Sequence, residues 1–179
     1  LYPTRGQLHV LGSSPRDVRT KERIGYLPEE SHFYDYLTAR ETLYFYARLF
    51  DLDPETARTR IDDLLQRAEL DGTGRRVVGE FSKGMRRRVG LAQALINNPD
   101  LIILDMMMPK RSGFLVMEKL RRSSRPHKII MITANEGKRH QQYAEALGVE
   151  GYMLKPVRLE RLITLSQELI EKRDDDESE

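Results

Sequence analysis

Short apolar runs and amphipathic stretches alternate along the second half of the chain. Apolar runs at 101–104, 128–132 and 151–154 have the length and composition of buried strands. Between and after them, apolar residues recur at helical spacing over 114–122, 136–147 and 159–171. Because strands that alternate with helices imply right-handed crossovers, the pattern predicts an α/β fold around a parallel sheet.

The first half of the chain combines two short strands with a long helical stretch. Strands are predicted at 7–11 and 23–27. From about 38 to 97 the apolar residues follow helical spacing, and Thr38 with Glu41 has the sequence of a capping box. We expect this stretch to form a helical subdomain beside the sheet, within one composite domain.

Three polar residues stand at the ends of successive predicted strands, where a parallel sheet places its ligand crevice. They are Asp105, Thr133 and Lys155. A carboxylate can be the nucleophile in phosphoryl transfer, and a hydroxyl and an ammonium can hold the phosphoryl oxygens. Taken singly, each has an ordinary structural interpretation, such as a helix cap for Thr133. Together they predict a site for phosphoryl chemistry.

Residues 99–171 resemble the response-regulator receiver family. Met108-Pro109 and Gly113 match the loop that follows the family's phosphoacceptor aspartate, and Tyr152 and Lys155-Pro156 match its switch aromatic and its lysine. The resemblance implies a flavodoxin-like sheet and a Lys155–Pro156 peptide bond that is commonly cis.

The same resemblance implies roles for the strand-end residues. Asp105 is expected to be the phosphoacceptor, Thr133 and Lys155 to contact the phosphoryl group, and Tyr152 to be the switch aromatic. It also implies two-component signalling or a phosphorelay, with a histidine kinase or a small phosphodonor as partner.

Residues 1–105 resemble the second half of an ABC transporter ATPase domain. GYLPEE at 25–30 is similar to the Q-loop region, FSKGM at 81–85 to the signature motif, and the strand ending at Asp105 to the Walker B strand. The resemblance implies that Ser82 and Gly84 are a remnant of the surface that binds ATP held by a partner subunit. Members of that family also bind membrane subunits.

Each resemblance lacks parts of its family's site. No G-x-x-x-x-G-K-[ST] motif occurs in this chain, and Met106 stands where ABC ATPases carry the acid that orients water. We therefore expect no intrinsic ATPase activity, and no ATP binding without a complementing Walker A motif. The receiver family's acidic pair is also missing from its usual first strand.

The two resemblances overlap at 99–105, which predicts a chimera. We expect a three-layer, mostly parallel, five-stranded receiver-like sheet with a helical subdomain from the ABC half. Its leading function is an impaired receiver-like phosphoacceptor module. An ABC-derived nucleotide-binding or partner-binding fragment, and a fold chimera without activity, stay open as alternatives.

A makeshift magnesium site is expected where strand 23–27 fills the vacant first-strand position. That placement brings Glu29 and Glu30 beside Asp105. Carboxylate and carbonyl oxygens suit Mg²⁺, so these three residues and the Met107 carbonyl are the expected ligands. The alternative is that Glu29 and Glu30 are solvated loop acids.

Composition adds few constraints. A net charge of +2 does not indicate a nucleic-acid partner, the lack of cysteine fits a cytoplasmic protein, and no apolar run approaches the roughly 18 residues of a membrane span. The arginines at 86–88 are expected on a solvated helix face, and the acidic tail at 172–179 is expected to be disordered. The oligomeric state is left open.

Overall fold

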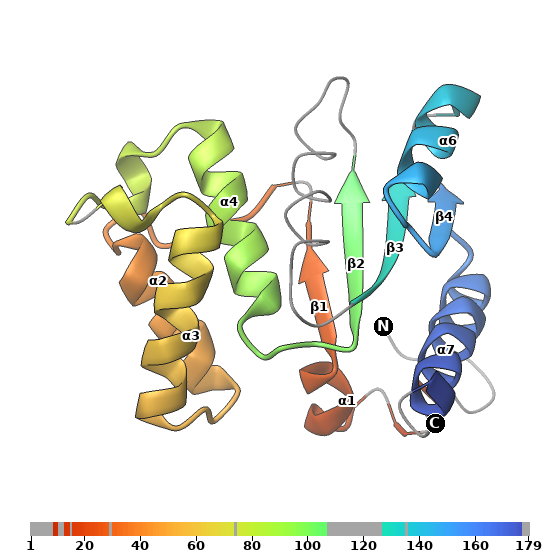
Figure 1. Ribbon diagram of the computed structural model, residues 1–179, viewed down its shortest axis with the longest axis horizontal. Coiled ribbons are helices and arrows are strands. Elements are labelled where there is room, and N and C mark those ends of the chain that lie inside the picture. The colour runs from red at the N-terminus through yellow and green to blue at the C-terminus, as the bar shows by residue number, and fades with distance from the viewer. Residues whose placement is uncertain are drawn as a thin grey trace.

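The computed structural model describes residues 9–10, 13–14, 16–28, 30–73, 75–106, 127–134 and 136–176. Within this part of the chain, four parallel strands lie side by side in the order β1, β2, β3, β4 (Figure 1). Their bounds are Ile24–Leu27, Leu101–Met106, Lys128–Thr133 and Gly151–Leu154. The predicted α/β class is confirmed, and the strands from residue 23 onward have the predicted order.

Strand β1 pairs with β2 on the side opposite to β3, as predicted. Their register pairs Leu27 with Leu104, so β1 ends beside the last residues of β2. The predicted strand at 7–11 lies largely outside the described residues, and Val10 within it forms an isolated antiparallel bridge with Ser13. The predicted helix at 114–122 also lies outside them.

Side chains alternate across β2 and so divide the core into two layers. Ile102 and Leu104 share one buried cluster with Leu91 of α4 (Lys83–Leu95) and Ala144 of α6 (Lys138–Ala146). On the opposite face, Leu101 packs in a cluster with Leu169 of α7 (Leu159–Asp176). Helices therefore cover both faces of the sheet, which confirms the three predicted layers.

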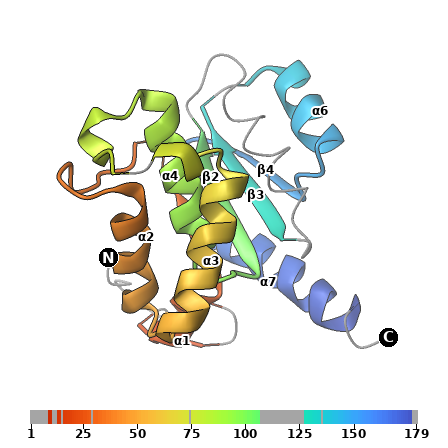
Figure 2. The same cartoon turned by 60° about the vertical axis from the view of Figure 1, so that its left-hand side comes forward.

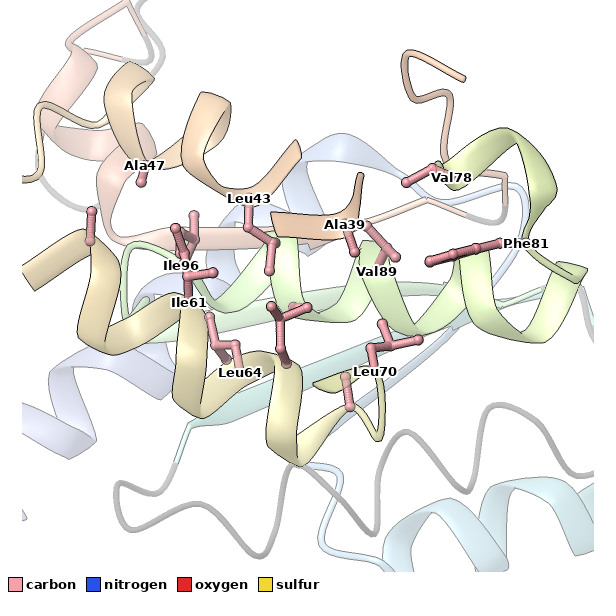
Figure 3. Packing of buried hydrophobic residues seen from close by; sticks show 14 residues of the cluster. Ala39, Leu43, Ala47, Ile61, Leu64, Leu70, Val78, Phe81, Val89 and Ile96 are labelled. Carbon is pink, nitrogen blue, oxygen red and sulfur yellow. The ribbon is translucent and has the colours of Figure 1, made fainter. Parts of the chain in front are cut away.

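A second hydrophobic core lies in the helical subdomain (Figure 3). It is built by α2 (Ala39–Leu49), α3 (Pro54–Arg67), the short 3-10 turn η2 (Val78–Glu80) and one side of α4. A second 3-10 turn, η1 (Asp71–Thr73), follows α3 and has no buried residue. The predicted capping box is present at the start of α2, where Thr38 and Glu41 satisfy each other's backbone N–H groups. A short helix, α1 (Val18–Glu22), precedes β1.

Helix α4 belongs to both cores, and it stands between the subdomain and the sheet (Figures 1 and 2). Val89 and Ala92 pack in the subdomain cluster, whereas Leu91 and Ala94 pack in the sheet cluster. A helix with apolar residues on two sides can join two layers in this way. The ABC-like signature helix is thus the element that attaches the subdomain to the sheet.

The C-terminal helix is longer than predicted. The acidic tail was expected to be disordered, yet α7 continues through residues 172–176 to Asp176. Elongating an existing helix gains one hydrogen bond for each residue fixed, which favours this extension. Among the described residues, no helix is both long enough and apolar enough to cross a membrane.

Candidate functional site

The three predicted strand-end residues meet at the carboxyl edge of the sheet. Thr133 is the last residue of β3 and pairs in register with Met106, the neighbour of Asp105. The backbone N–H of Lys155 donates to the Thr133 carbonyl at 2.8 Å, immediately after β4. Parallel strands of matched register therefore place the acid, the hydroxyl residue and the lysine along one edge, as predicted.

Asp105 and Lys155 form an ion pair at this edge. Lys155 Nζ lies 2.8 Å from Asp105 Oδ1, and the two side chains are 33% and 18% exposed. Oδ1 is buried, and apart from this ion pair it has no hydrogen-bond partner among the described residues. The carboxylate is thus largely shielded from solvent but not fully buried.

Thr133 and Tyr152 complete the predicted set. Thr133 is buried, with 4% of its surface exposed. Tyr152 lies in β4 opposite Met131, packs partly buried against the sheet cluster, and has its pKa raised by burial. The Lys155–Pro156 peptide bond is cis, as the receiver resemblance implies.

A fifth residue, Arg87 of α4, reaches the same edge from the helical side. It is 7% exposed, and its Nη2 donates to the Asp105 carbonyl oxygen at 3.1 Å while its Nη1 donates to the Pro28 carbonyl oxygen. The guanidinium thereby joins the ends of β1 and β2. The expectation that Arg87 is solvated was wrong.

The position of Arg87 in the helix explains its burial. It lies four residues before Leu91 and seven before Ala94, and both of these pack in the sheet cluster. Residues at this spacing share one helix face. Helical periodicity could therefore have identified Arg87, whereas the charge run of 86–88 concealed it.

Tyr26, in β1, also lies within the electrostatic range of the site. Burial raises the pKa of its phenol above the ordinary 10.0, and the Asp105 carboxylate raises it further. The charges of Lys155 and Arg87 act in the opposite direction. One carboxylate and two cations are therefore close enough to influence the same hydroxyl.

The magnesium hypothesis stays a prediction, since Glu29 and Met107 lie outside the described residues. The donors that are described do not favour it. Glu30 is exposed, and its Oε1 lies 4.0 Å from Lys83 Nζ. Across the described residues, no group of three or more His, Cys, Asp or Glu side chains could hold a metal ion. Lys155 and Arg87, which contact Asp105, are cations and are not metal ligands themselves.

The signature-motif residues stand at the exposed start of α4. Ser82 is the N-cap, and its hydroxyl accepts a hydrogen bond from the Met85 N–H at 3.2 Å. Gly84 is exposed, and a Cβ built there would meet only Ser82 Oγ, at 3.9 Å. Ser82 therefore stabilises the helix, and the backbone beside Gly84 is open to approach.

Comparison with family models gives a direct match to one of the two families. The family model described as the response regulator receiver domain matches residues 53–167, more than half of the 179 residues. The match runs from the end of the α2–α3 connection through all of β2, β3 and β4 and into α7. It includes Asp105, Thr133, Tyr152 and Lys155.

Curated relatives are ABC transporter ATP-binding proteins. An uncharacterized member from Synechocystis is 41% identical over 108 residues, which cover 58% of this chain and 30% of the relative. The protein NatA of Bacillus subtilis is 40% identical over 108 residues, which cover 59% of this chain and 44% of NatA. The chain thus spans less than half the length of these relatives.

Solved structures show the same likeness at the level of the fold. An ATP-binding subunit of an ABC transporter superposes with a TM-score of 0.56 at 23% identity, covering 85% of this chain and 56% of that one. A dimeric ATP-binding cassette bound to ADP and Pi gives a TM-score of 0.54 at 23% identity, covering 66% and 57%. Part of the chain is thus similar to ABC transporter ATP-binding proteins, while the receiver-domain model matches more than half of it, as in a chimera. By that match, the chain belongs to the response regulator receiver domain family.

Proposed function

We propose that the chain is a receiver-like phosphoacceptor module of the two-component type, with Asp105 as the residue that takes the phosphoryl group. The observation that carries this proposal is the ion pair between Asp105 and Lys155 at 2.8 Å, next to the strand end that holds Thr133. Lys155 and the Thr133 hydroxyl would contact the phosphoryl oxygens. Tyr152 would be the switch aromatic, which responds to phosphorylation of Asp105.

The phosphodonor would be a histidine kinase or a small acyl phosphate. The partial exposure of Asp105 and Lys155 supports access by a small donor. Transfer is expected to be slow, because the acids of the receiver family's first strand are not in their usual place. Under this proposal the chain accepts a phosphoryl group on Asp105 and does not hydrolyse ATP.

Labelling of the full chain with acetyl phosphate tests the proposal. Intact mass spectrometry should detect one added phosphoryl group on the wild-type chain and none on Asp105→Asn. Asp63→Asn is the matched control, since Asp63 is an exposed aspartate on α3 whose partner is Arg67. Lys155→Met should slow labelling about a hundredfold, as expected for loss of a charge that stabilises the transferring group. Equal labelling of Asp105→Asn, or none of the wild type, would disprove the proposed function.

A second candidate function rests on the start of α4. Ser82 and Gly84 lie at an exposed helix N-terminus, and the relatives are named as ATP-binding proteins. A nucleotide-binding or partner-binding fragment would use the open backbone beside Gly84, since N–H groups at a helix start favour phosphate.

Thermal unfolding with and without ATP separates the two candidates. Binding at a ligand concentration of about 100 times Kd stabilises a protein by about 2.7 kcal/mol, which is easily detected as a rise in Tm. Gly84→Leu should remove the rise without removing the Ser82 cap. No rise with the wild-type chain argues against this candidate. If neither ATP nor acetyl phosphate has an effect, the chain is a fold chimera without either activity.

A further inference from the structure

A groove between α2 and α3 shares no residue with the strand-end site. The two helices lie side by side in the helical subdomain (Figures 1 and 2). The groove has a volume of about 700 Å³, within the range of roughly 300–1,000 Å³ that is usual for small-molecule pockets. It is therefore large enough to hold one organic molecule.

The surface of this groove is mainly apolar and aromatic. Tyr44 and Phe45 of α2 line it and stay 44% and 40% exposed, and Ile61 of α3 lines it from the buried core. The ring of Phe45 is held edge-on against Tyr34, with 5.9 Å between the ring centroids. Aromatic rings that are positioned in this way offer a preformed surface to an apolar or aromatic ligand.

Two arginines line the groove without a counter-ion. Arg48 lies four residues after Tyr44 on α2, and Arg58 lies three residues before Ile61 on α3, so each shares a helix face with part of the apolar lining. Across the described residues, neither guanidinium has an ion pair or a hydrogen bond. Each is therefore available to an anion from outside the chain.

The other charged groups of the groove are already engaged. Arg40 forms an ion pair with Asp62. The Glu41 carboxylate accepts the N–H and the hydroxyl of Thr38 in the capping box, both at 2.8 Å. The charge that the groove can offer to a ligand is therefore positive.

From this arrangement we infer that the groove binds an amphipathic organic anion. Its apolar body would lie on the aromatic surface, and its carboxylate or sulfonate would accept hydrogen bonds from Arg48 and Arg58, because a guanidinium matches the geometry of such groups. An inorganic anion would leave the apolar surface uncovered, and a neutral molecule would leave both arginines without a partner. The inference concerns the helical subdomain and does not rest on the proposed phosphoacceptor function.

The first experiment compares two fluorescent probes on the full wild-type chain. Anilinonaphthalene sulfonate is an amphipathic anion, and phenylnaphthylamine has the same aromatic body without the sulfonate. We expect the sulfonate to bind about tenfold more tightly, since a hydrogen bond to a charged group contributes at least that factor. Sodium dodecanoate should displace it. Because only the wild-type chain is used, the comparison does not depend on whether any variant folds.

Variants then assign the binding to the groove. Arg48→Gln and Arg58→Gln should each weaken sulfonate binding about tenfold and leave phenylnaphthylamine binding unchanged. Tyr44→Ser should weaken both probes, because it removes part of the apolar surface. Arg67→Gln is the matched control, since it removes the same charge from α3 outside the groove, where Arg67 pairs with Asp63.

Several outcomes would overturn the inference. Equal affinities of the wild type for the two probes would show an apolar surface that does not recognise an anion. Sulfonate binding that Arg67→Gln weakens as much as Arg48→Gln would show unspecific attraction to positive charge.

Other occupants of the groove would give different results. If sedimentation shows that the wild type dimerises and that Tyr44→Ser does not, the groove binds a second copy of the chain. If the chain binds phosphatidylglycerol vesicles through Arg48 and Arg58 but neither monomeric probe, the groove faces a membrane surface. Either result would replace the inference, and neither affects the labelling of Asp105.

Discussion

The side chains of Arg23 and Asp100 form an ion pair, with 2.7 Å between Arg23 Nε and Asp100 Oδ2, directly before β1 and β2. The Asp100 N–H also donates to the Arg23 carbonyl oxygen at 2.9 Å. Side chains and main chain therefore join the same two strand ends. Because these residues are 77 positions apart, the pair fixes a long-range neighbour relationship at the amino end of the sheet.

Removal of this pair should destabilise the fold measurably. The Asp100 side chain is only 16% exposed, so its charge is less screened than that of a surface pair. We expect Asp100→Ala to lower the free energy of unfolding by about 2 kcal/mol, in the range for hydrogen bonds to charged groups. Urea denaturation of Asp100→Ala, Arg23→Ala and the double variant gives the coupling energy.

The matched control for this cycle is the exposed pair of Asp63 and Arg67, four residues apart on α3. Pairs of this kind contribute about 0.3–0.5 kcal/mol. A coupling between Arg23 and Asp100 that is no larger than this control would contradict the role assigned to the pair.

Close packing of β1 on α4 leads to a second prediction. A Cβ built on Gly25 would overlap the main-chain carbonyl oxygen of Ala94 and come within 2.9 Å of Pro99 Cγ. Since a helix carbonyl cannot rotate away, we expect Gly25→Ala to cost about 3 kcal/mol, at the upper end for overpacked sites. Gly72→Ala is the control, because nothing lies within 4 Å of a Cβ built there. Equal denaturation midpoints for the two variants would show that the strand and helix are less tightly packed than described.

The strand ends were predictable because they depend on short-range pattern and on one rule of parallel sheets. Asp105, Thr133 and Lys155 each follow an apolar run, and parallel strands bring such positions to one edge. Arg87 was missed because the charge run of 86–88 was weighed above its helical spacing from Leu91, which places it on the face that packs against the sheet. Composition alone places an arginine in solvent, whereas tertiary packing buries this one.

The subdomain was predicted in outline from local signals. Thr38 and Glu41 gave the start of α2 correctly, since a capping box uses only neighbouring residues. The extension of α7 over the acidic residues was not predicted, because repulsion between like charges was expected to outweigh the tendency of the helix to continue. Local caps were therefore more informative than charge runs in this chain.

The capping box also makes stability depend on pH in a direction that can be worked out. The Thr38 N–H donates to Glu41 Oε2 at 2.8 Å, and the Thr38 hydroxyl donates to the same oxygen at 2.8 Å. These bonds, the backbone one first, hold the pKa of Glu41 below its ordinary value of 4.5. A lowered pKa in the folded state means that the ionised carboxylate stabilises the fold above pH 4.5. This stabilisation is lost as the pH falls through the folded-state pKa.

Glu41→Gln should remove this pH dependence while it keeps a cap of similar shape, because glutamine can also accept the Thr38 N–H bond. We expect the wild type to unfold at a higher temperature than the variant at neutral pH. The difference should shrink steadily between about pH 5 and pH 3, because the wild-type carboxylate becomes protonated there. Glu55→Gln is the control, since Glu55 is an exposed glutamate in the first turn of α3, and there the capping oxygen belongs to Asp53. If the difference between wild type and Glu41→Gln is the same at every pH, the carboxylate of Glu41 does not stabilise α2 through its charge.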